Sequence, residues 1–251
     1  MRKRPHILTA AKALYISFEG VAEYVKRAFS IRIHDSSVMP KRSDRYKKAL
    51  IVYGDDEGHR HKDVAQIMGG WLREEGFDVT LSDTLDSFLE TNRLKSMHLI
   101  VLIWTRGTIR PQQLANLLSA VRDGVGFTGI HSTIGAFRGE IDFHHMIGGQ
   151  FLAHPGGADT TYTVHMSGNH PQITQGLSDF TVTTEKYYMM LDPAICVLAW
   201  TCFGEVEMPV AWTKSYGHGR IMYCSLGHTL NMVTLPQVEI LMKRGMNWAS
   251  R

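Results

Sequence analysis

Short hydrophobic runs alternate with amphipathic stretches from about residue 47 to residue 131. The runs at 49–53 and 98–104 are apolar almost throughout, which is typical of parallel strands covered on both faces. Residues 64–72 and 109–122 instead repeat their apolar positions with helical spacing, and a glycine-rich strand follows at 125–130. This alternation of strand and helix predicts a doubly wound, mainly parallel α/β sheet.

The second half of the chain is richer in short extended segments. A turn at 214–219 separates two of them and predicts a hairpin, and the chain closes with a helix from Pro236 to Trp248. We find no internal repeat and expect residues 47–251 to form one α/β domain. The remaining strands are expected at 77–81, 161–166, 181–184, 196–201, 209–213 and 221–225.

Residues 1–46 follow a different pattern and are expected to form a loosely attached N-terminal extension. Positions 10–29 space their apolar side chains as in an amphipathic helix, and the polar stretch 35–48 indicates a linker. The simpler interpretation is that these residues are only a loosely attached extension, or that they result from an upstream start codon. A docking helix for a partner is the alternative.

Composition narrows the classes of partner. The net charge is only +3, and much of the basic excess lies in the first 48 residues, which argues against a nucleic-acid surface on the main domain. We find no run of 18 apolar residues, so no membrane-spanning helix is expected. Three cysteines without paired spacing favour a reducing, cytoplasmic setting.

Polar residues follow the predicted parallel strands at the points where the strands end. The loops GDDEGH, TRGT and HSTIGAF place His59, Trp104, Thr105 and His131 at the carboxyl edge of the sheet, where open α/β sheets bind their ligands. His228 follows a later strand in the same way. Histidines in such positions are candidate general acids and bases, because their pKa lies near neutrality.

The segment Gly124–His131 runs as a glycine-rich strand into a sharp turn. This is the layout of a nucleophile elbow, but the residue at the tip is a histidine rather than a serine or cysteine. Ser132 lies one position beyond the tip, which makes it a weaker candidate for a nucleophile. Further along the chain, His154 lies in the loop after MIGGQFLA, and Glu185 stands just before Tyr187 and Tyr188.

Taken in order, these segments resemble one family. GDDEGH, IWTRG, GVGFTGIH, MIGGQFLAHP, EKYYM and GHGRIMYCSLGH are similar to motifs of the ThuA-like (trehalose utilisation) family, which is structurally related to the class I glutamine amidotransferases. The match runs from about Lys48 to Arg251. Family members usually carry a G-x-H-G-G turn, and here Ser132 and Thr133 replace the last two glycines.

The resemblance implies a three-layer α/β sandwich of the class I glutamine amidotransferase-like type, with extra hairpin strands in the second half. It also implies a role in carbohydrate catabolism on 3-keto glycosides, such as oxidised trehalose or sucrose, beside a sugar dehydrogenase. His131 takes the place of the amidotransferase cysteine, so glutaminase activity is not expected.

The candidate site residues follow from these positions together. We expect an enzyme that uses no cofactor and moves protons next to a keto group, which covers isomerisation and glycosidic cleavage. Its partner would be a small-molecule sugar, and homo-oligomerisation is left open. The expected catalytic residues are His59, His131, His228 and Glu185, and the expected substrate-binding residues are Trp104, Thr105, Gln150, His154, Tyr187 and Tyr188.

Two other functions remain open from the sequence. His59, His131, His154, His228 and Glu185 would provide imidazole and carboxylate ligands for a metal-dependent hydrolase, provided that the fold brings them together. Alternatively, the altered turn after His131 and the basic extension fit a sugar-binding or sensing module without catalysis. Metal analysis and activity after chelation separate the metal-dependent enzyme from the metal-free one.

Overall fold

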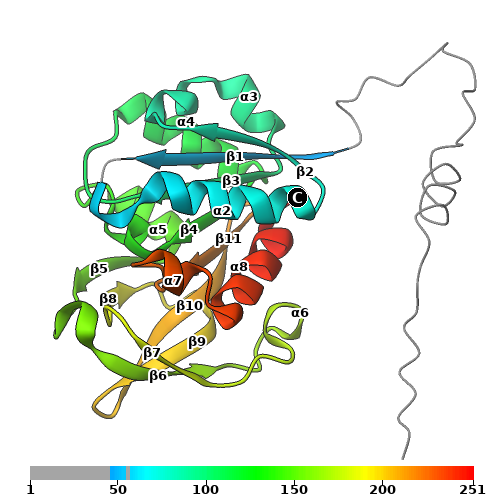
Figure 1. Cartoon of the computed structure of the whole chain (residues 1–251). Coiled ribbons are helices and arrows are strands. Elements are labelled where there is room, and N and C mark those ends of the chain that lie inside the picture. The colour runs from blue at the N-terminus through cyan, green and yellow to red at the C-terminus, as the bar shows by residue number, and fades with distance from the viewer. Residues whose placement is uncertain (1–45, 55–56) are drawn as a thin grey trace, which may run out of the picture. The chain divides into compact units, whose positions relative to one another are not determined.

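The main sheet runs through the whole compact unit formed by residues 45–251. The structure is a computed structural model that describes residues 46–54 and 57–251. Nine strands pair in the order β2-β1-β3-β4-β11-β10-β9-β6-β7 in this part of the chain (Figure 1). They are β1 (Lys47–Gly54), β2 (Phe77–Ser82), β3 (Leu99–Trp104), β4 (Gly126–Ile130), β6 (Thr161–Met166), β7 (Phe180–Thr183), β9 (Cys196–Phe203), β10 (Val206–Tyr216) and β11 (Gly219–Cys224).

The sheet has a parallel and an antiparallel part that meet at β11. β2, β1, β3, β4 and β11 pair in parallel, whereas β10, β9, β6 and β7 continue the sheet with antiparallel pairing. The β10–β11 hairpin therefore folds β11 back beside β4, so that the carboxyl ends of these two strands lie together. A second, two-stranded sheet pairs β5 (Gly149–Ala153) with β8 (Tyr188–Leu191).

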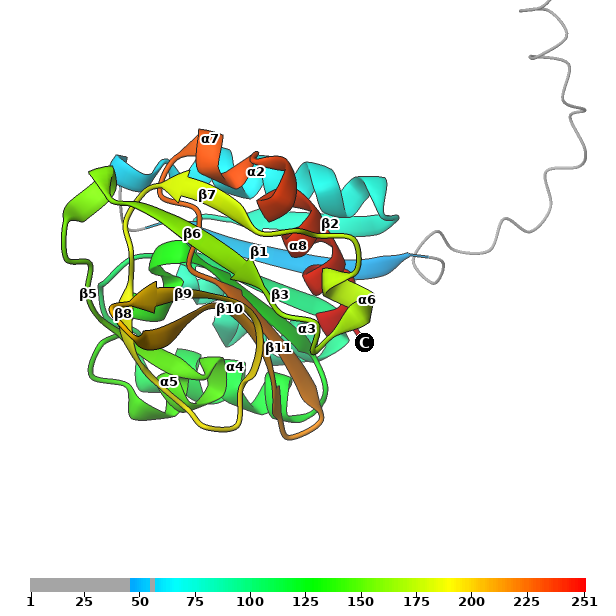
Figure 2. The same ribbon diagram turned by 90° about the horizontal axis from the view of Figure 1, so that it is seen from below.

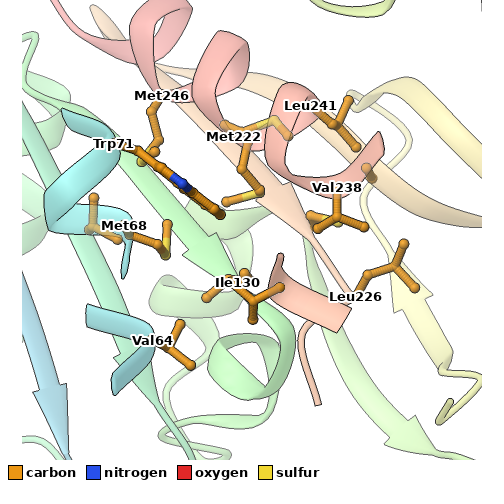
Figure 3. Close-up of a cluster of buried hydrophobic side chains, with 14 of the residues drawn as sticks. Val64, Met68, Trp71, Ile130, Met222, Leu226, Val238, Leu241 and Met246 are labelled. Atoms are coloured by element: carbon orange, nitrogen blue, oxygen red, sulfur yellow. The ribbon is translucent and has the colours of Figure 1, made fainter. Parts of the chain in front are cut away.

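Helices cover both faces of the sheet, as Figure 2 shows. On one face, α2 (His61–Glu74) and α8 (Pro236–Ala249) pack side chains such as Met68, Trp71 and Met246 against Met222 of β11 (Figure 3). The other face is covered by α3 (Thr91–Ser96), α4 (Pro111–Arg122) and α5 (Ile141–Ile147). Each fully buried large aliphatic or aromatic side chain contributes about 1.5–3 kcal/mol, so these two layers fix the strand ends that carry the site.

Short elements complete the described part of the chain. None of its helices is long and apolar enough to cross a membrane. The short helices are α6 (Pro171–Thr174), α7 (Leu230–Val233) and the 3-10 turns η2 (Glu57–His59), η3 (Leu85–Leu89), η4 (His131–Gly135) and η5 (Gly157–Asp159).

The structure confirms the predicted fold class, with its mainly parallel sheet between helices and its additional antiparallel strands. One boundary was wrong: Lys47 and Lys48 begin β1 rather than end a linker, because both pair with β2. The sequence pattern also failed to indicate β5, β8 and α3. The helix expected over residues 10–29 lies outside the described residues.

Candidate functional site

A cavity of about 590 Å³ opens at the carboxyl edge of the parallel strands. Its wall combines residues that follow β1, β3 and β4 with residues from β5 and from the segment between β7 and β8. The lining residues are His59, Thr105, Arg106, Ser132, Gly135, Arg138, Phe151, Leu152, Ala153, His154, Pro155, Glu185 and Tyr187. This is the place where a doubly wound sheet offers a ligand its binding crevice.

His131 stands at the sharp turn that the sequence predicted after β4. Its backbone has φ 48°, in the left-handed region that a non-glycine residue rarely adopts. Two contacts hold it there: Nδ1 is 2.9 Å from the Ser225 carbonyl oxygen, and the Tyr223 hydroxyl donates to the His131 carbonyl at 2.6 Å. A Cβ on Gly227 would lie 3.1 Å from the His131 Cβ, so a glycine allows the two strand ends to approach.

The protonation of His131 follows from these surroundings. Nδ1 carries the proton, because its partner is a carbonyl oxygen that can only accept. Burial lowers the pKa of His131 to about 3, although its bond to the Ser225 carbonyl opposes the shift, and His59 and His228 lower it further. His131 is therefore a neutral imidazole at ordinary pH, and its Nε2 is left as an acceptor.

Glu185 is the carboxylate around which the histidines gather. It lies between β7 and β8, and only 12% of its side chain is exposed. Its Oε2 is 3.4 Å from His131 Nε2 and 3.5 Å from His228 Nδ1, while Oε1 is 3.8 Å from His154 Nε2. The rings of His131 and His228 are both 5.3 Å from the ring of His59.

Tyr187 closes this cluster from the side of the second sheet. Its hydroxyl lies 3.1 Å from His131 Nε2 and donates to that nitrogen. Burial raises the pKa of Tyr187 well above its usual value, and the Glu185 carboxylate adds to the shift, so the phenol stays protonated. The phenol is thus a permanent donor beside the carboxylate.

A second polar arrangement on the cavity wall consists of His61, Thr105 and Ser132. His61 Nδ1 is 2.7 Å from the Gly54 carbonyl oxygen and must donate to it, which leaves Nε2 as an acceptor. That Nε2 lies 3.0 Å from Thr105 Oγ1 and 3.5 Å from Ser132 Oγ, and the two hydroxyl oxygens are 2.5 Å apart. We call this set the hydroxyl chain, because it connects a hydroxyl in the cavity to a buried imidazole.

The structure brings most of the predicted site residues together. His59, His131, His228 and Glu185 form one cluster, in which one ligand atom from each lies within 4.8 Å of the others. Thr105, His154 and Tyr187 line the cavity beside it. We call the four residues His59, His131, Glu185 and His228 the acceptor cluster.

Three predicted substrate-binding residues do not line the cavity. The ring of Trp104 lies over Gly54, where an added Cβ would be 2.9 Å from the ring. The same ring also lies beside the ring of Phe137. Gln150 donates from Nε2 to the Arg138 carbonyl. Tyr188 is 44% exposed and packs against Phe203, because alternation along β8 turns it away from the cavity.

Several residues in the cavity wall or directly behind it were not predicted from the sequence. His61 forms a His-x-His pair with His59, a signal that was present and overlooked. Arg106, Arg138 and Phe151 reach the cavity through loop and β5 geometry, which no local sequence pattern indicates. Ser132 was weighed only as a nucleophile, and it instead shares a hydrogen bond with Thr105.

The fold and the site together define a doubly wound α/β protein with a histidine- and carboxylate-lined cavity at its carboxyl edge. The family model for ThuA, trehalose utilisation, matches residues 48–249, and the chain belongs to this family. Membership supports a carbohydrate-related role. No curated protein matches the chain.

Solved structures share the fold at low sequence identity. A putative ThuA-like protein from Parabacteroides merdae has a TM-score of 0.66 and 18% identity, over 82% of this chain and 90% of that one. Another, from Bacteroides uniformis, has a TM-score of 0.67 and 16% identity, over 84% and 95%. A cytoplasmic protein from Salmonella typhimurium has a TM-score of 0.62 and 13% identity, over 81% and 100%.

Proposed function

We propose that this protein is an enzyme of carbohydrate catabolism that acts on 3-keto glycosides by moving a proton next to the keto group. The observation that carries the proposal is the position of Glu185. Its carboxylate lies on the cavity wall, within 3.4–3.8 Å of nitrogen atoms of three histidines. A largely buried carboxylate among imidazole nitrogens is well placed to accept a proton and to share it with its neighbours.

The chemistry begins at the carbon next to the ketone. The keto group acidifies that C–H bond, Glu185 takes the proton, and the electron pair moves onto the ketone oxygen to give an enediolate. Return of a proton to the neighbouring carbon gives an isomer. Expulsion of the glycosidic oxygen, which takes up a proton as it leaves, cleaves the sugar instead.

Both outcomes need a second proton-handling group, and the hydroxyl chain provides one. Ser132 and Thr105 face the same cavity as Glu185, and the Nε2 of His61 accepts a hydroxyl proton behind them. The hydroxyl chain would take up a proton from a substrate hydroxyl, hold it on His61 Nε2 and return it through the hydroxyls to the ketone oxygen or the departing oxygen. Tyr187, a protonated phenol on the cavity wall, would donate to the negative oxygen of the enediolate.

The cavity suits a sugar in size and lining. Its volume of about 590 Å³ falls in the range of small-molecule sites, and it combines Phe151 with polar groups such as Arg106 and His154. A sugar dehydrogenase that oxidises the 3-hydroxyl would supply the ketone, so the two enzymes would act in succession in the cytoplasm.

The experiment is incubation of the full-length protein with 3-keto-trehalose and 3-keto-sucrose in D₂O, followed by product analysis. We expect deuterium at the carbon next to the carbonyl and loss of that exchange in Glu185→Gln. Tyr188→Phe is the matched control, because that residue lies outside the cavity, and it should exchange at the wild-type rate. Hydrolysis without exchange, or exchange that survives Glu185→Gln, would contradict the proposed reaction.

A further inference from the structure

We infer that the acceptor cluster binds one divalent transition-metal ion, with Zn²⁺ as the best match to its ligands. His59, His131, Glu185 and His228 each offer one ligand atom, and these four atoms lie within 4.8 Å of one another. Three imidazole nitrogens and one carboxylate oxygen are the donors that zinc and its neighbours prefer, whereas magnesium and calcium prefer oxygen alone.

The distances within the cluster are too long for closed hydrogen bonds. Charge-assisted N–H···O bonds have lengths of about 2.7–2.9 Å, but Glu185 Oε2 is 3.4 Å from His131 Nε2 and 3.5 Å from His228 Nδ1. Two ligands that are each about 2.1 Å from a tetrahedral ion lie about 3.4 Å apart. These two separations match the edges of a coordination shell, and the other ligand atoms of the cluster lie within 4.8 Å.

The hydrogen-bond accounting leads to the same conclusion. His131 donates its Nδ1 proton to the Ser225 carbonyl, so its Nε2 faces Glu185 as a lone pair. The Nδ1 of His228 is buried and has no hydrogen-bond partner among the described residues. The lone pair of His131 Nε2, the Glu185 carboxylate and the unpartnered His228 Nδ1 thus face one point, and the Tyr187 hydroxyl supplies a proton to His131 Nε2 alone. A cation at that point would satisfy all of them at once.

The surroundings of the ligands are those of a metal site with an open position. A histidine ligand commonly donates its second ring nitrogen to a backbone carbonyl, as His131 does, which fixes the ring and its tautomer. His59 and Glu185 also line the cavity, so an ion between them would have room for one more oxygen ligand. The four ligands come from separate segments after β1, β4, β7 and β11.

The role of the ion in turnover rests on the proposed function, but its binding does not. Bound to the ketone oxygen, the ion would polarise the carbonyl and stabilise the charge of the enediolate as a Lewis acid. Glu185 would bind the ion through Oε2 and keep Oε1, on the His154 side, for the substrate proton. The inference thereby deepens the proposed reaction without changing which bonds break.

The test measures metal binding without substrate. Full-length protein is stripped with EDTA, dialysed and titrated with ZnCl₂ by calorimetry, and Co²⁺ serves as a second probe through its visible absorption. We expect one tight equivalent of Zn²⁺ and intense cobalt bands of low coordination number. Glu185→Gln and His228→Ala should each weaken the Kd by at least about 10-fold.

His145→Ala is the matched control, because His145 is a surface histidine 3.8 Å from the carboxylate of Asp192, and it should leave the Kd unchanged. Circular dichroism and the Tm verify that each variant is folded. If a variant is unfolded, the cobalt spectrum of the wild type decides alone: bands of octahedral, water-like cobalt would overturn the inference.

Absence of a tight equivalent, or affinity that survives both cluster variants, would also overturn the metal site. The metal-binding test and the deuterium-exchange test of the proposed function can fail independently of each other. Zinc binding without any deuterium exchange would retain the metal site and reject the keto-glycoside reaction. Exchange at full rate in metal-free protein would retain the proposed reaction and reject only the role of the ion in turnover.

Discussion

The hydroxyl chain and the acceptor cluster lie on the same cavity but differ in how their hydrogen bonds are balanced. In the hydroxyl chain donors and acceptors are matched: His61 donates to the Gly54 carbonyl, Thr105 donates to Ser132, and His61 Nε2 accepts a hydroxyl proton. In the acceptor cluster, Glu185 Oε2 faces the lone pair of His131 Nε2 at 3.4 Å. The first arrangement is complete as it stands, whereas the second is completed by a cation or by a proton taken from substrate.

This difference indicates which polar groups of the site take part in a reaction. Buried polar groups that already satisfy one another contribute to order and to proton transfer. Two buried acceptors that face each other destabilise the folded protein. Such an arrangement is expected to persist where it serves a function. Substitutions in the two arrangements should therefore differ in size and in kind.

The largest effect is expected from Glu185→Gln. The substitution keeps the size of the side chain and removes the base, so kcat should fall by about 10²–10⁴-fold, the usual contribution of general acid–base catalysis. Steady-state kinetics on a 3-keto glycoside measures it, with the exposed Glu205→Gln as control. A kcat close to that of the wild type would remove Glu185 from the reaction.

A smaller effect, on stability, is expected from the protonation of His131. Its folded pKa of about 3 lies below the unfolded value of 6.5, so between these values the unfolded chain binds the extra proton. The free energy of unfolding should thus fall as pH falls below 6.5, by up to about 1.4 kcal/mol per pH unit from this residue. Urea unfolding between pH 6.5 and 4.5, in EDTA, measures the slope.

His131→Asn retains a donor for the Ser225 carbonyl and cannot titrate, so its pH slope should be shallower than that of the wild type. Some slope should remain, because burial also lowers the pKa of His144. Equal slopes in the two proteins would mean that His131 is not held neutral.

The smallest effect is expected from Thr105→Val in the hydroxyl chain. The substitution preserves shape but removes the hydroxyl between Ser132 and His61. Loss of one such hydrogen bond costs about 0.5–1.5 kcal/mol, so kcat should fall up to about 10-fold while KM changes little. Thr105→Ser should restore kcat. A change confined to KM would show that Thr105 only contacts the substrate.

The parallel half of the fold could be predicted because β1 and β3 are almost continuous hydrophobic runs and amphipathic helices separate the strands. The same regularity placed His59 and His131 at one edge, since the carboxyl ends of parallel strands meet there. Trp104 shows the limit of that rule: it ends β3 as expected, but its ring packs over Gly54 and not into the cavity. A strand exit specifies an edge of the sheet and not the direction of a side chain.

The rest of the site depends on strand pairings that the sequence pattern does not predict. β5 and β8 are short, half-exposed strands whose pairing holds Phe151 beside the cavity, and their apolar stretches are too short to indicate a strand by themselves. Glu185 was singled out as a carboxylate beside two phenols, Tyr187 and Tyr188, but nothing local predicts that it meets the histidines. Its approach to the histidines follows from how the antiparallel half returns toward β11.

The position of β11 also has a consequence for synthesis on the ribosome. This strand separates β4 from β10 in the sheet, yet it begins only at Gly219. Until it emerges, β4 is an unpaired edge, and the nascent protein exposes a template for wrong pairing. His228 arrives later still, so a ribosome-bound chain has neither a closed sheet nor a complete acceptor cluster, and premature termination would release an aggregation-prone fragment.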